Sequence, residues 1–398
     1  MDRDELVELL SPTGLDLLDE LPPYSSQADV VKLVSALRTA GHPPGLVAAV
    51  LTQAKLRAKA GGPHGKFGEF AARMLFTDAG LEQATRLAVA GRHAARFRSA
   101  GLSRVADLGC GIGGDALAMA ALGLSVIAVE RDEVTAAIAA YNLAPFENAV
   151  VEHGDTADFD LARVDGVFFD PARRTAGHTD TRRLTDPSDY SPALGSVFAT
   201  ATHTPTGVKL GPAFDRDAIP ADAEAQWVSV DGSVVELGLW FGALARGGVK
   251  RAALVVAGSG ASELTGASDT PDEEVGALGG YVYEPDGAVI RARLIGDLAR
   301  RLDAHPVGAG IAYLSGETLA ATPFATAFRV VEELPFAEKA LGAALRARGV
   351  GPLEIKKRGV DVDPAVLRQR LRLRGTLPAT IILTRVAGRH TALLVARV

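Results

Sequence analysis

A glycine-rich turn between two apolar runs constrains the fold of this chain more than any other feature of its sequence. The segment RVADLGCGIGGDALAMAALGLSVIAVERD, residues 104–132, places Gly109, Gly111 and Gly114 after a short apolar run. A helical stretch and a second apolar run follow the turn. A tight glycine turn that opens a helix lets the backbone approach a ligand closely. The segment therefore predicts a strand, a ligand-binding turn, a helix and a second strand.

The periodicity of the chain changes near this turn. Residues 1–98 carry apolar residues at spacings of three and four, which predicts a helical N-terminal region. From residue 99 to residue 262, short apolar runs alternate with helical stretches, as in a parallel sheet with crossover helices. Here SVVELGLWF and RAALVVAGS predict an antiparallel pair at the sheet edge, and segment 258–280 predicts a loop or linker. Residues 275–398 predict a second, smaller α/β domain.

Length and composition are those of a globular protein of several domains. The 398 residues suffice for two or three domains. The single cysteine, Cys110, excludes an internal disulfide and a thiolate zinc cluster, and it fits a reducing compartment. The first residues lack an export signal, and no window reaches the roughly 18 uninterrupted apolar residues of a membrane helix. We therefore expect a cytoplasmic protein with no metal and no membrane partner.

Two ligands compete for the glycine turn, a dinucleotide and S-adenosylmethionine. Gly109, Gly111 and Gly114 match the G-x-G-x-x-G pattern of dinucleotide sites, and Glu130 lies about where a ribose-binding acid is expected. Asp107, near the end of the first predicted strand, favours S-adenosylmethionine over a dinucleotide. A methionine ammonium would give this carboxylate a partner, directly or through water, whereas a pyrophosphate would be repelled.

An acidic residue stands at the end of each of the four predicted strands: Asp107, Glu130, Asp155 and Asp170. The carboxyl ends of parallel strands line one crevice, where ligands bind. A cationic, donor-rich ligand suits such a crevice better than an anionic dinucleotide does. The alternative is that each acid caps the helix after it, which explains one acid more readily than all four.

The motifs VADLGCGIGGD, VIAVERD, EHGD and VFFDPARR resemble those of class I S-adenosylmethionine-dependent methyltransferases over roughly residues 100–260. The resemblance implies a Rossmann-like sheet and S-adenosylmethionine as the cofactor. The cofactor contacts that it implies are Asp107, Gly109 and Gly111 around the methionine part, Gly113 and Asp115 closing the loop, Glu130 at the ribose hydroxyls and Asp155 at the adenine.

The sequence FFDPARR bears on the methyl acceptor. Methyltransferases that act on exocyclic amines of bases carry Asp/Asn-Pro-Pro-aromatic here, and oxygens of this motif accept hydrogen bonds from the amine. Asp170 and Pro171 match the motif, and we assign them to catalysis. Ala172 and Arg173 depart from it, although an arginine could stack on a base instead. Reaction at a pyrimidine carbon would need a cysteine nucleophile, and Cys110 belongs to the cofactor loop.

Basic and loop residues on both sides of the core complete the predicted substrate site. Arg173 and Arg174, with Arg182 and Arg183, could hold phosphates, and a solvated loop with local Arg–Asp pairs is the alternative. Lys66 and Phe67 precede the core in a segment that loosely resembles one in trimethylguanosine-synthase-like methyltransferases. That resemblance implies a loop folded over the pocket, and the alternative is the start of a helical domain.

The C-terminal end is basic although the whole chain has a formal net charge of −6. Residues 335–398 hold thirteen Lys and Arg against four Asp and Glu, a net of +9, so the remainder carries −15. A polyanionic partner and a solubilising face are both consistent with this imbalance. The stretch LEIKKRGVDVDP resembles the THUMP-like domain behind some bacterial methyltransferases, and true THUMP domains bind RNA. We assign Lys356, Lys357 and Arg358 to substrate binding on this basis.

Together these features predict an α/β protein with a Rossmann-like class I methyltransferase sheet, a helical N-terminal region and a small C-terminal α/β, THUMP-like domain. We expect an S-adenosylmethionine-dependent methyltransferase that acts on transfer or ribosomal RNA, at an exocyclic amine or another base nitrogen. One alternative is a methyltransferase for a small metabolite, whose basic C-terminal end is structural. The other is a non-catalytic RNA-binding protein that retains the fold. The oligomeric state is not indicated.

Overall fold

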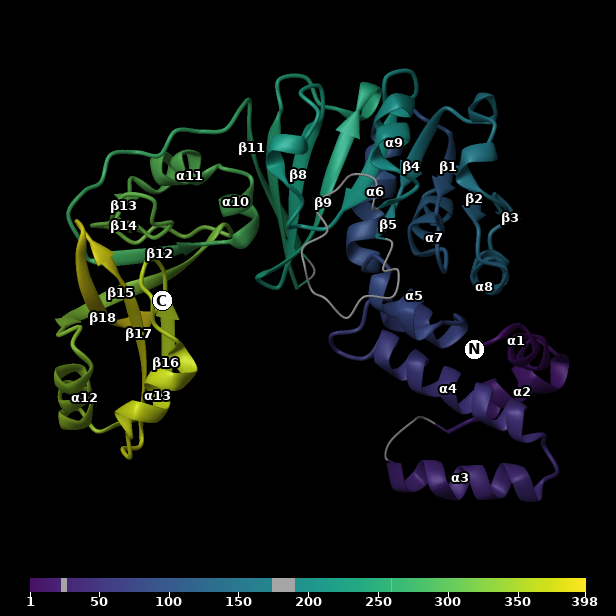
Figure 1. Ribbon diagram of the computed structural model, residues 1–398, viewed down its shortest axis with the longest axis horizontal. Coiled ribbons are helices and arrows are strands. Elements are labelled where there is room, and N and C mark those ends of the chain that lie inside the picture. The colour runs from purple at the N-terminus through teal and green to yellow at the C-terminus, as the bar shows by residue number, and fades with distance from the viewer. Residues whose placement is uncertain (23–26, 174–189, 259) are drawn as a thin grey trace. The chain divides into compact units, whose positions relative to one another are not determined.

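The computed structural model describes residues 1–22, 27–173, 190–258 and 260–398 (Figure 1). The described chain divides into two compact units. One unit comprises Met1–Leu210 and Trp240–Ala245, and the other comprises Gly211–Leu239 and Arg246–Val398. The predicted cofactor turn lies in the first unit, and the predicted C-terminal domain lies in the second.

The N-terminal region is helical, as its apolar spacing predicts. Its elements are α1 (Arg3–Leu9), α2 (Pro12–Glu20), α3 (Gln27–Thr39), α4 (Pro44–Gly61), the 3-10 helix η1 (Gly68–Arg73), α5 (Asp78–Gln83) and α6 (Leu87–Ser99). Asp2 and Glu5 cap α1 reciprocally, because each carboxylate accepts from the backbone N–H of the other residue. Helix α4 packs on α1 and α2 and buries Leu46, Val50 and Leu56.

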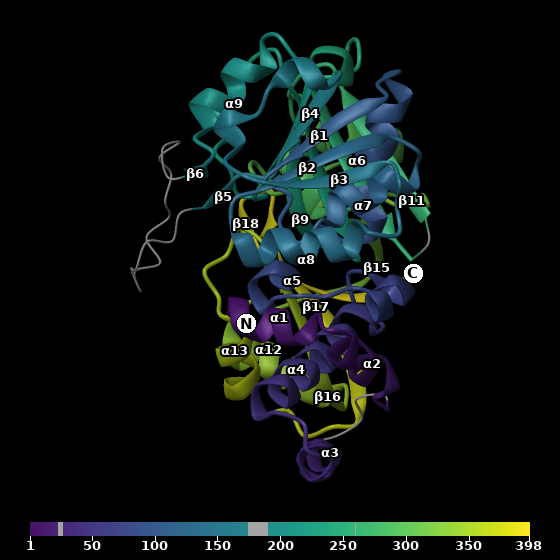
Figure 2. The same ribbon diagram turned by 90° about the vertical axis from the view of Figure 1, so that its right-hand side faces the viewer.

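Within the described residues, a nine-stranded sheet has the order β11-β10-β8-β9-β7-β4-β1-β2-β3. Its strands are β1 (Arg104–Leu108), β2 (Ser125–Glu130), β3 (Ala149–His153), β4 (Gly166–Phe169), β7 (Thr206–Leu210), β8 (Glu224–Val230), β9 (Ser233–Phe241), β10 (Arg251–Ala257) and β11 (Gly260–Gly266). Strands β3, β2, β1, β4 and β7 pair in parallel. The connecting helices include α7 (Gly114–Ala121), α8 (Glu133–Leu143) and α9 (Leu194–Ala201), and α7 and α8 lie beside β2 and β3 (Figure 2). The Rossmann-like sheet is therefore confirmed, with the carboxyl ends of its parallel strands at one edge.

Two predictions about the sheet edge are wrong. Strand β10 pairs in parallel with β8, and its antiparallel partner is β11 rather than the preceding run. Strand β11 lies inside the segment predicted to be a loop. Its sequence, GASELTG, has only one large apolar residue, Leu264, which is fully buried. A strand at a sheet edge needs little apolar surface, because it packs on one neighbour only, so its hydrophobic pattern is weak.

The second unit contains the predicted small α/β domain, with a seven-stranded sheet among the described residues in the order β13-β14-β12-β15-β18-β17-β16. Its elements are β12 (Tyr281–Pro285), α10 (Gly287–Arg291), α11 (Ile295–Leu302), β13 (His305–Pro306), β14 (Leu314–Gly316), β15 (Ala325–Leu334), α12 (Glu338–Ala347), β16 (Val350–Lys357), α13 (Pro364–Leu371), β17 (Leu377–Val386) and β18 (Arg389–Arg397). Helices α12 and α13 cover one core of this domain, where Leu345, Leu371 and Ile381 are buried. A search of the described helices finds none that is long and apolar enough to cross a membrane.

Candidate cofactor and acceptor site

The carboxyl ends of β1, β2, β3, β4 and β7 surround a cavity of about 520 Å³ in the first unit. The sequence-predicted residues that line it are Gly109, Gly111, Asp115, Glu130, Asp155, Asp170 and Pro171. Residues 77–85, in and around α5, supply another wall. Side chains far apart in the sequence therefore share one cavity, as the common edge of the parallel strands predicts.

The glycine turn forms the part of the cavity next to β1. Gly109 and Gly111 have φ angles of +91° and +54°, which side chains rarely allow. The N–H groups of Gly109 and Cys110 donate to the carbonyl of Val129, 2.9 and 3.1 Å away, and tie the turn to β2. A Cβ atom on Gly111 would meet nothing within 4 Å. The turn thus has a fixed backbone and leaves free space above Gly111 for a ligand.

Two of the acids present carboxylates to this space. Glu130 Oε2 accepts from the N–H of Gly111 at 3.0 Å, and Oε1 accepts from the N–H of Asp132 at 2.9 Å. These bonds hold the carboxylate in one orientation, and its remaining lone pairs can accept from a ribose diol. Asp155 lines the cavity and also caps the 3-10 helix that starts at Thr156, through the N–H of Ala157. Capping and ligand binding are therefore compatible for Asp155.

Asp107 and Gly113, which the resemblance assigns to cofactor binding, do not line the cavity. Asp107 is only 1% exposed, and its Oδ2 accepts from the N–H of Ala116 in α7. Its Oδ1 is buried without a hydrogen-bond partner among the described residues. Burial raises the pKa of Asp107 well above its usual range, and the nearby Asp115 and Asp170 carboxylates raise it further. A cationic donor that reached Asp107, directly or through water, would supply the missing partner, so the ammonium of S-adenosylmethionine fits this site.

Asp115 joins the cavity to a buried polar cluster. Its Oδ2 accepts from the hydroxyl of Thr85 at 2.6 Å, and its Oδ1 lies 2.8 Å from Nδ1 of His93. Burial opposes ionisation of Asp115, but the hydrogen bond and charge of His93 outweigh it, so the pKa of Asp115 lies below its usual value. The imidazole also packs against the rings of Phe168 and Trp240. Asp115, which follows the glycine turn in the chain, therefore ties the start of α7 to the wall at Thr85.

Lys209 is a charged residue of this cavity that the sequence interpretation missed. It lies in β7, and its Nζ is 2.5 Å from Oδ2 of Asp170 and 3.2 Å from the carbonyl of Gln83. Its side chain is only 13% exposed. The available signal was one lysine within the apolar run GVKLG, predicted to be a strand of the same sheet. The ion pair with this ammonium holds the Asp170 carboxylate at the predicted acceptor position.

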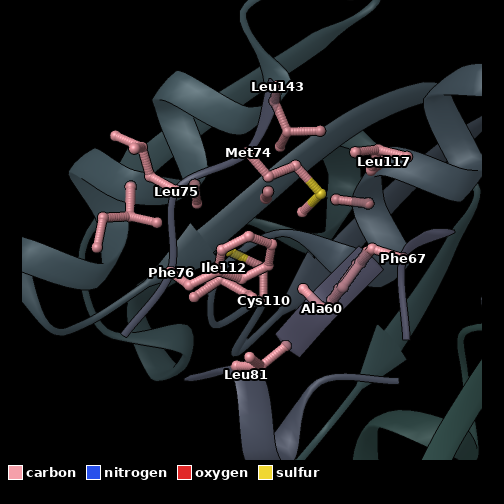
Figure 3. Close-up of a cluster of buried hydrophobic side chains, with 14 of the residues drawn as sticks. Ala60, Phe67, Met74, Leu75, Phe76, Leu81, Cys110, Ile112, Leu117 and Leu143 are labelled. Carbon is pink, nitrogen blue, oxygen red and sulfur yellow. The ribbon is translucent and has the colours of Figure 1, made fainter. Parts of the chain in front are cut away.

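A second lysine, Lys66, holds the wall formed by residues 77–85. Its Nζ donates to the carbonyls of Glu82 and Ala84, at 2.5 and 2.7 Å. Burial lowers the pKa of Lys66 to about 8, and the charge of Lys209 contributes to this lowering. Phe67 is fully buried and packs on Phe76 within a core that includes Cys110 and Ile112 of the glycine turn (Figure 3). Lys66 and Phe67 do not line the cavity themselves, but they support the segment that does.

Lys66→Met is expected to lower the free energy of unfolding by about 1–3 kcal/mol, because two carbonyls lose their donor. The pKa of Lys66 is about 8 in the folded chain, against an ordinary value of 10.5. Between these pH values the unfolded chain binds more protons, so the parent gains stability over the variant as pH rises. Thermal unfolding at pH 7.5 and pH 9.5 measures both effects. Lys55→Met, on an exposed residue of α4, is the control, and a stability gap that narrows at pH 9.5 would contradict this account.

The predicted basic substrate residues do not form one group. Only the backbone of Arg173 is described, in the short strand β5 (Ala172–Arg173), and Arg174, Arg182 and Arg183 lie outside the described residues. Lys356 Nζ lies 2.6 Å from the carboxylate of Glu284, in an ion pair within the second unit. Lys357 is exposed, whereas Arg358 lies over the ring of Tyr313 and lines a separate cavity. In the described part of the chain, no group of three or more His, Cys, Asp or Glu residues could hold a metal ion.

Comparisons with known proteins bear on the family and the fold of this chain. A family profile described as THUMP domain-like matches residues 325–397, and one described as a domain of unknown function matches residues 2–60. An uncharacterized S-adenosylmethionine-dependent methyltransferase of Mycobacterium tuberculosis H37Rv is 35% identical over 336 residues, covering 81% of this chain and 89% of the relative. A crystal structure from Porphyromonas gingivalis W83, provisionally named a methyltransferase, has a TM-score of 0.72 at 20% identity, covering 94% of this chain and 99% of that chain, and shows the fold. The chain belongs to the S-adenosylmethionine-dependent methyltransferases.

Proposed function

We propose that this methyltransferase modifies a nitrogen atom of an RNA base, with an exocyclic amine as the preferred acceptor. The observation that carries the proposal is the Asp170 carboxylate, which lines the cavity beside Pro171 and is paired with Lys209. An amine acceptor needs a hydrogen-bond acceptor at this point, because the bond directs the nitrogen lone pair. The THUMP domain-like match at residues 325–397 supports RNA over a small metabolite.

The cofactor supplies the methyl group on an activated sulfonium. Glu130 would hold the ribose hydroxyls, Asp155 the adenine, and the turn at Gly109 and Gly111 the methionine part. Asp170 and the carbonyl of Pro171 accept hydrogen bonds from the two N–H groups of the acceptor amine. After transfer the nitrogen carries a positive charge, and the Asp170 carboxylate would accept the proton that it loses. Lys209 acts as a positioning residue, since its ion pair fixes the carboxylate.

Incubation of the protein with labelled S-adenosylmethionine and total RNA tests the proposal. RNA from cells that lack the protein is expected to accept label, and nucleoside mass spectrometry is expected to show one N-methylated nucleoside. RNA from cells that contain the protein should accept little, because its sites are already modified. If cofactor binding is normal and no RNA nucleoside changes, whereas a small-metabolite pool accepts label, the metabolite alternative holds instead.

A further inference from the structure

A second cavity, of about 760 Å³, lies wholly within the unit formed by Gly211–Leu239 and Arg246–Val398. Four arginines line it: Arg216, Arg291, Arg293 and Arg358. Among its described lining residues there is one carboxylate, Asp215, and its Oδ1 accepts from the N–H of Asp217. The cavity wall therefore carries a net positive charge of three, which favours an anionic ligand.

None of the described carboxylates pairs with the four guanidinium groups of this cavity wall. By contrast, the guanidinium group of Arg246 in the same unit forms ion pairs with both Glu224 and Glu263. Arg291 donates to the carbonyl of Pro212 at 2.9 Å, which orients the side chain without cancelling its charge. Arginines placed in this way can form charge-assisted hydrogen bonds with a phosphate.

The same cavity also has an apolar and aromatic surface. Trp227 of β8 and Ile290 of α10 contribute to its lining, and the half-buried ring of Phe214 lies among them. Inorganic phosphate would leave this surface without a partner. A nucleotide uses both parts, since its phosphate binds arginines and its base stacks on an aromatic ring or a guanidinium plane.

Arg293 stands at a backbone position that usually holds glycine. It follows the end of α10 with a φ angle of +59°, in the left-handed region. An arginine is conformationally disfavoured there relative to glycine, yet it places a fourth cation in the cavity wall. Arg293→Gly therefore removes the charge while it relieves the backbone, so weaker binding by this variant would reflect the charge rather than the fold.

We propose that this cavity binds one nucleotide of the RNA substrate, with the arginines on its phosphate and Phe214 under its base. The inference rests on the proposed function for its choice of RNA. Arg358, which the sequence predicts to bind substrate, lines this cavity with Arg216, Arg291 and Arg293. Lys356 is paired with Glu284 and does not line it. The cavity is distinct from the acceptor site, whose lining residues all lie in the other unit.

Fluorescence anisotropy of the whole chain with a labelled oligouridine tests this site. Arg293→Gly and Arg216→Ala are each expected to weaken binding about tenfold. Each should also flatten the dependence of log affinity on log salt by about 0.7 for every phosphate that the variant no longer holds. Arg301→Ala is the matched control, because Arg301 is an exposed arginine of α11 that does not line the cavity, and its affinity should equal that of the parent.

The outcomes separate this inference from the proposed function. If both variants bind oligouridine as the parent does, the cavity assignment is overturned, even if the parent still methylates RNA. If the variants lose affinity only for uridine monophosphate or inorganic phosphate, the ligand is a free phosphate compound and the RNA assignment is overturned. If the parent neither binds nor methylates RNA, both proposals fail. Selective loss of oligouridine binding in the two cavity variants supports the site.

Discussion

Asp170→Ala is expected to slow methyl transfer to RNA by about 10²–10⁴-fold while the affinity for S-adenosylhomocysteine stays near that of the parent. The variant removes the oxygen that would orient the acceptor nitrogen, but it leaves the glycine turn and Glu130 in place. Single-turnover kinetics measure the transfer step, and calorimetric titration measures the binding of the cofactor product. A transfer rate close to the parent value would place the acceptor elsewhere in the cavity.

Asp170→Asn is the matched comparison, because it keeps the size of the side chain and one acceptor oxygen, while it replaces the other oxygen by an NH₂ donor and removes the charge. Its rate is expected to fall between those of the parent and Asp170→Ala. The loss of charge also breaks the ion pair with Lys209, whose Nζ lies 2.5 Å from the carboxylate. Lys209→Met should therefore resemble Asp170→Asn in rate. Equal rates for Asp170→Asn and Asp170→Ala would show that the charge of the carboxylate is required in addition to its hydrogen-bond acceptor.

Asp107→Asn is expected to have opposite effects on stability and on cofactor affinity. The amide oxygen can keep the bond from the N–H of Ala116, and the NH₂ group takes the place of the unpartnered Oδ1. The variant removes a carboxyl group that the folded chain must either bury as a charge or protonate beside Asp115 and Asp170, so the free energy of unfolding at neutral pH should rise by about 1–3 kcal/mol. The ligand ammonium then faces an N–H donor, and affinity for S-adenosylhomocysteine should fall about 10–100-fold.

The difference in stability between the parent and Asp107→Asn should depend on pH. The pKa of Asp107 is raised in the folded chain, so the parent loses stability as pH rises from the unfolded pKa toward the folded one. Below the unfolded value, near pH 4, both states are protonated and the asparagine variant has no advantage. Thermal unfolding of the two proteins should therefore differ most at neutral pH and converge toward pH 4. An equal difference at all pH values would mean that Asp107 does not titrate in this way.

Local patterns predicted which strand ends share one cavity. The glycine turn and three of the strand-end acids, Glu130, Asp155 and Asp170, line one cavity because parallel pairing dictates where strands end. The burial of Asp107 was not predicted: its side chain is almost fully buried and does not line the cavity. Lys209 was missed because its partner is 39 residues away, and only the pairing of β4 with β7 brings them together.

The pairing of the charged side chains at the basic end of the chain could not be predicted from the sequence. Lys356, Lys357 and Arg358 are adjacent, and charge counts treat them as one patch. In the structure Lys356 is paired with Glu284, Lys357 is exposed, and Arg358 lies in the arginine-lined cavity. Alternation along β16 and the turn after it separate the three side chains. Which cations remain available to an anion depends on partners that lie far away in sequence.

The three consecutive carbonyls of Glu82, Gln83 and Ala84 accept hydrogen bonds from two lysines, Lys66 before them in the chain and Lys209 in β7 after them. Thr85, the next residue, bonds to Asp115 beside the cofactor turn. Consequently the enzyme cannot be trimmed to its sheet, because a fragment that starts at residue 99 would lack a cavity wall and leave Lys209 and Asp115 short of partners. We therefore expect methyl transfer to need the helical N-terminal region as well as the sheet, so a fusion protein built with this transferase should include both.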